Sequence, residues 1–185
     1  MKRIFGIFLL VLLSGLLFTP AAKGGAREDK LVEFAADGNV DGVRGLLDQG
    51  ADVNAKQSEA GCTALGASIV FYDSAHAQDY INVVKLLLAR GADVNAVAFL
   101  GGTPLTAAVQ NGEADIVRIL IEHKADVNKT NDVGDTALMV ANSVLEKGIL
   151  DVNDSAKKPS YRPLTAAEKA TYTEIVRMLQ AAGAK

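Results

Sequence analysis

The sequence contains few of the residue types from which many functional sites are built. Of its 185 residues, one is cysteine, two are histidine and none is tryptophan, and only 5% are aromatic. A single cysteine excludes a disulfide within the chain and a cysteine-rich zinc site. With 49% hydrophobic residues, the chain is nevertheless too apolar to be disordered, and its length allows one ordinary domain or a short array of repeats.

Positive charge is scarce outside the N-terminus. Residues 1–26 carry three basic and no acidic side chains, which leaves 16 of the 19 basic and all 22 acidic side chains in the remainder, a net charge of −6. Binding to a phosphate backbone requires clustered cations, and no run of lysine and arginine occurs. We therefore expect no nucleic-acid partner.

The N-terminal segment has the pattern of a secretory signal peptide. Lys2 and Arg3 precede an apolar run over residues 4–18, and small residues follow it. The run of 15 residues is shorter than the roughly 20 that span a bilayer as a helix, which favours cleavage over membrane anchoring. The small residues fit cleavage after Ala21 or after Ala26, and only an uncleaved segment would hold the chain at a membrane. We expect a signal peptide over residues 1–26 and an exported bacterial protein, periplasmic or secreted.

A short motif recurs through the rest of the chain. Gly-Ala-Asp-Val-Asn occurs at residues 50–54 and 91–95, Lys replaces Gly in the copy at 124–128, and Gly183-Ala184 repeats its first two residues. Its aspartate recurs once per repeat, as expected of a turn-forming residue rather than of a catalytic or calcium-binding one. An apolar stripe with helical spacing precedes each copy; its members are Val43, Leu46, Leu47, Val83, Val84, Leu87, Leu88, Ile116, Val117, Leu120, Ile121, Ile175, Val176 and Leu179.

The most regular copy covers residues 102–128. Thr103 can cap a first helix, Pro104 suits its first turn, and Gly112 can end it because glycine tolerates positive φ. The apolar spacing predicts a second helix over about residues 114–122. This unit resembles the ankyrin repeat.

The resemblance, which covers about residues 28–185, implies an all-α solenoid of about four helix-turn-helix pairs with short hairpin loops. One such pair cannot bury its own apolar face, so neighbouring pairs must stack. We expect a signal peptide followed by one ankyrin-repeat domain over residues 27–185, with repeats at about 28–56, 57–97, 98–130 and 131–185. Insertions interrupt the second and fourth repeats at residues 71–79 and 146–160, and both should leave the stack opposite the hairpin tips. After the longer insertion, Thr165 and Glu168 form a capping box that predicts a helix to about Ala181.

Two features predict local costs in stability. Gly42 and Gly45 lie within the expected second helix of the first pair, where each costs about 1 kcal/mol relative to alanine. Lys124 replaces glycine at a turn where the resemblance implies left-handed backbone, at a cost of roughly 1 kcal/mol.

The resemblance places partner binding on the hairpin tips and the first helices. The second tip contains the apolar residues Val97, Phe99 and Leu100, whereas the third contains the polar residues Asn131 and Asp132. An apolar tip flanked by polar ones is typical of a binding hot spot. We assign these five residues to partner contact; the alternative is that the apolar side chains pack against the adjacent tip.

The shorter insertion is rich in aromatic residues. Phe71, Tyr72, His76 and Tyr80 lie in or next to it. We predict that Phe71 and Tyr72 belong to a second contact surface; the alternative is that the rings fold back over exposed helix ends.

Catalysis has little support in the sequence. His76 and His123 belong to no metalloprotease motif, and Cys62 would need a histidine brought close in space to act as a nucleophile. A free or intermolecular thiol is the simpler interpretation of Cys62. We therefore expect no catalytic, cofactor-binding or metal-binding residues, and a non-catalytic module or scaffold that binds another protein. The alternatives are a secreted effector or inhibitor of another protein, and an enzyme whose site is built by the insertions.

Overall fold

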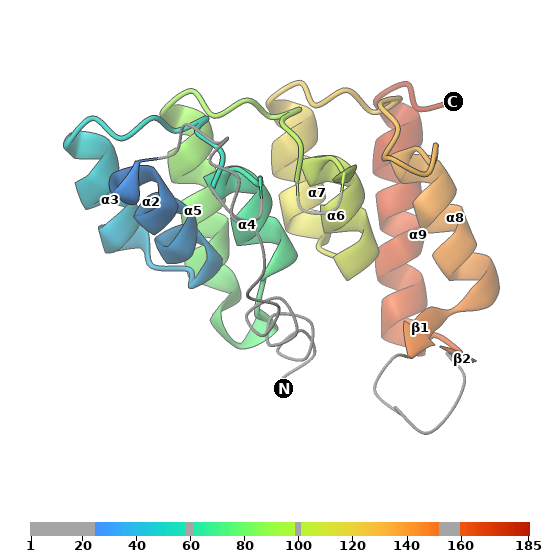
Figure 1. The fold of residues 1–185 in the computed structure, drawn as a ribbon. Coiled ribbons are helices and arrows are strands. Elements are labelled where there is room, and N and C mark those ends of the chain that lie inside the picture. Colours follow the sequence, from blue (N-terminus) through green and yellow to red (C-terminus); the bar gives the residue numbers. More distant parts are fainter. Residues whose placement is uncertain (1–24, 58–60, 99–100, 152–159) are drawn as a thin grey trace, which may run out of the picture.

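The computed structural model describes residues 25–57, 61–98, 101–151 and 160–185. In these residues eight α-helices follow one another in antiparallel pairs (Figure 1). The pairs are α2 (Ala26–Ala36) with α3 (Val40–Asp48), α4 (Ala64–Val70) with α5 (Ala77–Ala89), α6 (Pro104–Asn111) with α7 (Ala114–Glu122), and α8 (Ala137–Lys147) with α9 (Ala166–Ala181).

Two insertions carry the remaining elements. A short 3₁₀ helix, η1 (Ser74–His76), precedes α5, and the strands β1 (Ile149–Asp151) and β2 (Ser160–Arg162) pair antiparallel between α8 and α9. The insertion at 71–79 therefore does not form a loop throughout, because α5 already begins at Ala77. The strand pair at the base of the longer insertion was not predicted.

The helices form two layers. The first helices of the pairs contact one another in the order α2, α4, α6 and α8, and the second helices do so in the order α3, α5, α7 and α9. The prediction of an all-α solenoid of four pairs is confirmed. Its core runs through the whole stack, since every pair contributes to the largest fully buried side chains, which are Leu31, Val43, Leu65, Ile69, Val83, Val84, Leu87, Leu105, Ile116, Leu120, Ile175 and Leu179.

Threonines start four of the helices. The hydroxyls of Thr63, Thr103, Thr136 and Thr165 each accept a hydrogen bond from the backbone N–H three residues later. This contact satisfies one of the N–H groups that a helix leaves unpaired at its start. The predicted cap of α6, the extent of α7 and the capping box of α9 are all confirmed.

The two glycines of α3 differ in their surroundings, which corrects the expectation that both cost stability. A Cβ built on Gly42 would lie 2.5 Å from the ring of Phe34, whereas one built on Gly45 meets nothing within 4 Å. We expect Gly45→Ala to raise the free energy of unfolding by about 1 kcal/mol, because alanine is the better helix former. Gly42→Ala should lower it by about 1–3 kcal/mol through overpacking. Urea unfolding of both variants tests this, and equal effects of the two would contradict it.

Lys124 has the left-handed backbone that the sequence predicts. Its φ is 66°, and it is the one non-glycine residue with positive φ among the described residues. The corresponding Gly50 and Gly91 have φ of 82° and 86°. We expect Lys124→Gly to stabilise the protein by about 1 kcal/mol and to raise Tm by a few degrees. A lower Tm for this variant in thermal unfolding would refute the assignment of strain to the lysine.

Candidate functional site

The connections between helix pairs and the insertions lie on opposite edges of the stack. The described parts of the three hairpin tips, at residues 49–57 with 61–63, 90–98 with 101–103, and 123–136, lie along the upper edge in Figure 1, and η1 and the β1–β2 pair lie along the lower edge. We call these the tip edge and the insertion edge. The predicted separation of tips and insertions is confirmed.

Asparagines join successive turns along the tip edge. The Oδ1 of Asn54 accepts a hydrogen bond from the N–H of Asp93 at 2.7 Å, and the Oδ1 of Asn95 accepts one from the N–H of Asp126 at 2.8 Å. Asn128 continues the series by accepting from the N–H of Lys185 at 2.9 Å. These bonds connect residues more than 30 positions apart, so the tip edge is cross-linked from one repeat to the next.

The recurrent aspartates shape the turns themselves. The Oδ1 atoms of Asp52, Asp93 and Asp126 each accept the backbone N–H two residues later, at 2.9 Å. This contact is a side-chain turn of the kind that aspartate favours, so the prediction that these residues form turns is confirmed. The role of the asparagines was missed, although their recurrence in the copies at 50–54, 91–95 and 124–128 was a usable signal.

The second tip carries an exposed apolar side chain. Val97 is 41% exposed, whereas the next residue, Ala98, is buried. Phe99 and Leu100, the other residues assigned to this tip, lie outside the described residues. Contact of Val97, Phe99 and Leu100 with a partner stays a prediction.

The third tip is a tight turn organised by Asn131. Its Oδ1 accepts from the N–H of Val133 at 3.1 Å and from the N–H of Asp135 at 2.8 Å. Asp132 is exposed and approaches the preceding tip, because a Cβ built on Gly101 would lie 2.6 Å from the Cβ of Asp132. The side-chain oxygen of Asn131 is thus engaged within the turn, and contact of Asn131 and Asp132 with a partner stays a prediction.

Two strongly exposed apolar residues were missed in this region. Val133, at the third tip, is 73% exposed, and Met139, in the first turn of α8, is 51% exposed. Neither has a distinctive sequence signal of its own. Comparison of repeats reveals the anomaly at Met139, since its counterparts Gly66 and Thr106 are buried.

The aromatic residues of the insertion edge pack on the scaffold. Phe71 and Tyr72 are half-buried against the core, and the Tyr72 and Tyr80 ring centroids are 5.5 Å apart. The Tyr72 hydroxyl donates a hydrogen bond to Glu113, the residue that precedes α7. Only part of each ring is left for a second contact surface, which stays a prediction for Phe71 and Tyr72.

Side chains of the next repeat cover the ends of the first helices. The Tyr80 hydroxyl donates to the Ala36 carbonyl at 2.9 Å, and the Tyr172 hydroxyl donates to the Gln110 carbonyl at 3.0 Å. The side-chain amide of Asn111 donates a hydrogen bond to the carbonyl of Ile69 at 2.8 Å. Because the last carbonyls of a helix have no partner within the helix, these bonds stabilise both the helix end and the contact between repeats.

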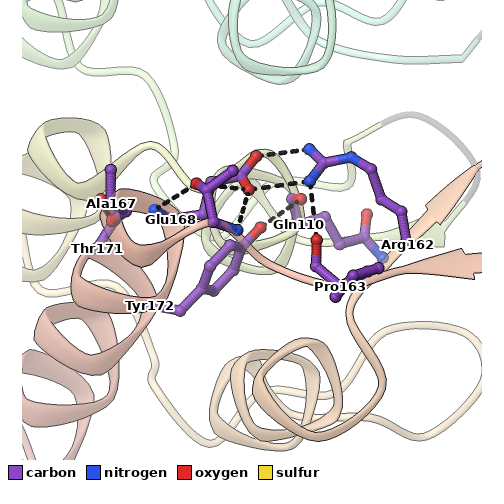
Figure 2. A network of polar contacts seen from close by, with 8 residues as sticks. Gln110, Arg162, Pro163, Ala167, Glu168, Thr171 and Tyr172 are labelled. Carbon is purple, nitrogen blue, oxygen red and sulfur yellow. Dashed lines mark hydrogen bonds and ion pairs between the residues drawn. The ribbon is translucent and has the colours of Figure 1, made fainter.

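A charged network fastens the longer insertion to α9 (Figure 2). The Arg162 guanidinium donates two hydrogen bonds to the Glu168 carboxylate, which also accepts the Thr165 N–H at 2.9 Å. The arginine bonds, with a smaller contribution from Thr165, lower the pKa of Glu168 to about 2. The charges neutralise each other, so the network anchors β2 rather than offering a reactive group.

The residues considered for catalysis do not come together. Cys62 precedes α4 and His76 follows its other end, so the length of a seven-residue helix, about 10 Å, separates them. His76 is exposed and its Nδ1 lies 3.1 Å from Asp73, while the Nδ1 of His123 lies 2.8 Å from the Ile119 carbonyl. In the part of the chain that the structure describes, no group of three or more His, Cys, Asp or Glu side chains could hold a metal ion.

Cys62 is a free but buried thiol, and burial raises its pKa. Burial and the raised pKa favour a free thiol over an intermolecular disulfide, because thiolates are the reactive form. We expect a small aromatic disulfide reagent to modify Cys62 at least about 100-fold more slowly in the native protein than in urea, since labelling requires local opening. Ser74→Cys, at an exposed position, should label rapidly in both conditions. Similar native rates at the two positions would contradict this.

The fold and its edges define a class of protein. Stacked helix pairs with hairpin tips on one edge, joined by side chains from one pair to the next, form a solenoid of the kind that presents an extended binding surface. None of its helices in the described ranges combines the length and apolar character that membrane spanning requires.

The chain belongs to the ankyrin-repeat family. The family model for ankyrin repeats, in three copies, matches residues 70–185, well over half of the sequence. Domains of this family are typically non-catalytic modules that bind other proteins. The match begins at Val70, the last residue of α4, so α2 and α3 precede it and join the array through their contacts with α4 and α5. No curated protein matches this chain.

Proposed function

We propose that this chain is a non-catalytic protein-binding module of the bacterial periplasm, which contacts its partner through the hairpin tips and the concave face of the first helices. The observation that carries the proposal is the distribution of exposed apolar side chains. Of the four large hydrophobic residues exposed among the described residues, Val97, Val133 and Met139 belong to the tips or to the first turn after them, and only Tyr161 lies on the insertion edge. Apolar residues gathered on one edge are typical of a binding surface.

Export is supported by the N-terminal sequence, and the start of the first helix bears on where the signal peptide is cleaved. The carbonyl of Gly25 accepts the N–H groups of Glu28 and Asp29 at 3.0 and 3.1 Å. Cleavage after Ala21 preserves this first turn, whereas cleavage after Ala26 removes the residue that begins it. We therefore favour cleavage after Ala21, which mass spectrometry of the exported protein tests directly.

Site-specific photocrosslinking in a bacterial host tests the binding edge. A photoreactive phenylalanine analogue replaces Val97 in the full chain, and the control replaces Lys85, an exposed residue of α5 in the second layer. We expect a protein adduct from position 97 and none from position 85. Adducts from position 85 alone would refute binding through the tips.

Fractionation of the same cells tests the compartment. Release of the adduct by osmotic shock supports a periplasmic module. Accumulation of the protein in the culture medium would instead support a secreted effector or inhibitor.

A further inference from the structure

Val133 is the most exposed large hydrophobic residue in the described part of the chain. It is held outward by a rigid turn, because Asn131 accepts hydrogen bonds from the backbone on both sides of it, and the N–H of Asn131 donates to the Asp135 carbonyl at 3.0 Å. A contact residue fixed in this way loses little conformational freedom on binding.

Met139 lies at a position that is covered in the two preceding repeats. It is the third residue after the capping threonine of α8, as Gly66 is in α4 and Thr106 is in α6, and both of those residues are buried. Over Gly66 lies the following hairpin tip, because a Cβ built on Gly66 would be 2.9 Å from the Cα of Ala98. No tip among the described residues covers Met139, which is 51% exposed. At the equivalent position of α4, a segment of the chain itself fills this space.

Leu138 is also less buried than its counterparts in the two preceding repeats. Its counterparts Leu65 and Leu105 are fully buried, whereas Leu138 is only partly buried. Val133, Leu138 and Met139 lie within seven residues of one another in the chain, at the third tip and the first turn of α8, and we call these three residues the terminal surface.

The charged residues closest to Val133 in the chain are acidic. Asp132 and Asp135 flank the turn of Val133, and neither forms an ion pair with the described residues. The nearby cation Lys129 is directed to the preceding tip, where its Nζ donates to the Asn95 carbonyl at 2.7 Å. The first helices α4 and α6 contain no charged residue. The local field therefore favours a cationic neighbour.

We propose that the terminal surface, with Asp132 and Asp135, binds an extended segment of a partner protein in which an apolar side chain stands beside a lysine or arginine. The segment lies over α8 as the second hairpin tip lies over α4, with its apolar side chain against Val133 and Met139 and its cation at the aspartates. This inference rests on the proposed function and specifies the partner's chemistry and the end of the array that it contacts.

Selection of random 12-residue peptides on the full chain tests the inference, with affinities of the selected peptides measured by fluorescence anisotropy. We expect peptides in which a basic residue adjoins an apolar one. Val133→Ser and Met139→Gln should each weaken their binding about 10-fold, which is a typical effect at a binding hot spot. Asp132→Asn should weaken it about threefold at low salt and less at high salt. Tyr161→Ser, on the insertion edge, is the matched control and should have no effect.

The possible outcomes separate the two proposals. Peptides that lose affinity with Val97→Ser but not with Val133→Ser or Met139→Gln would overturn the terminal surface and leave binding through the tips intact. Selection of peptides in which an acidic residue, and not a basic one, stands next to the apolar residue would overturn the charge assignment. Peptides unaffected by every tip substitution would overturn both proposals. Since all of these positions are exposed, a Tm equal to that of the parent shows that a loss of binding is not a loss of folding.

Discussion

Replacement of Gly148 by alanine is expected to lower the free energy of unfolding by about 3 kcal/mol, the sum of backbone strain and a steric collision. Gly148 ends α8 with φ 88° and ψ −171°, a region that is almost closed to residues with a side chain. A Cβ at this position would also overlap the backbone carbonyl of Arg162, the residue paired with Ile149 across the strands. A backbone carbonyl held in a strand cannot move aside as a flexible side chain can. The strand pair must therefore separate from the end of α8.

Urea unfolding and hydrogen exchange measure this effect, and Gly134 provides the control. Gly134 has nearly the same φ, 89°, but a Cβ built on it meets nothing within 4 Å. Gly134→Ala should therefore cost only the strain, about 1–2 kcal/mol. In Gly148→Ala, we also expect faster exchange of the amides of β1 and β2. Equal losses of stability in the two variants would show that the collision is relieved at no cost.

Replacement of Glu113 by glutamine is expected to stabilise the protein at pH 8 by about 1–2 kcal/mol and to have little effect at pH 5. Burial, with a smaller contribution from Asp115, raises the pKa of Glu113 to about 7 from its usual value of 4.5, against the opposing hydrogen bond from Tyr72. The folded state therefore holds the proton more tightly than the unfolded state does. The stability that this proton contributes is fully present below pH 4.5 and is lost as the pH rises through about 7. Glutamine stays neutral at every pH and can still accept the Tyr72 hydrogen bond.

The measurement is the free energy of unfolding in urea at pH 5, 6.5 and 8. Asp115→Asn is the control, because Asp115 is exposed on the first turn of the same helix and contacts Arg118 at 3.7 Å. Its replacement should cost a few tenths of a kcal/mol, through the lost contact with Arg118 and the lost negative charge at the start of α7. A constant gain for Glu113→Gln from pH 5 to pH 8 would show that the carboxyl does not titrate with a raised pKa.

Most features that depend on short stretches of chain were predictable. Thr103 caps α6 through a bond that spans three residues, and Lys124 adopts positive φ because it stands where the other copies have glycine. The two layers followed from the spacing of the apolar stripes, since side chains three and four residues apart share one helix face.

The candidate site was only partly predictable. The sequence correctly places Val97 at an exposed tip, but it does not reveal Val133 and Met139 as exposed, because exposure depends on what the neighbouring repeat covers. The prediction for Gly42 was wrong. Gly42 was expected to cost stability, but its lack of a side chain makes room for the Phe34 ring.

The sequence by itself determined the repeat, the helix starts and the left-handed turns of this protein, because each depends on hydrogen bonds and steric limits within a few residues. Only the tertiary structure decided which side chains join one repeat to the next, such as the asparagines of the tip edge and the tyrosines that cover helix ends. These contacts connect residues 31 to 62 positions apart. They form only when stacking has buried the shared core, and stacking also decides which apolar side chains at the end of the array stay exposed.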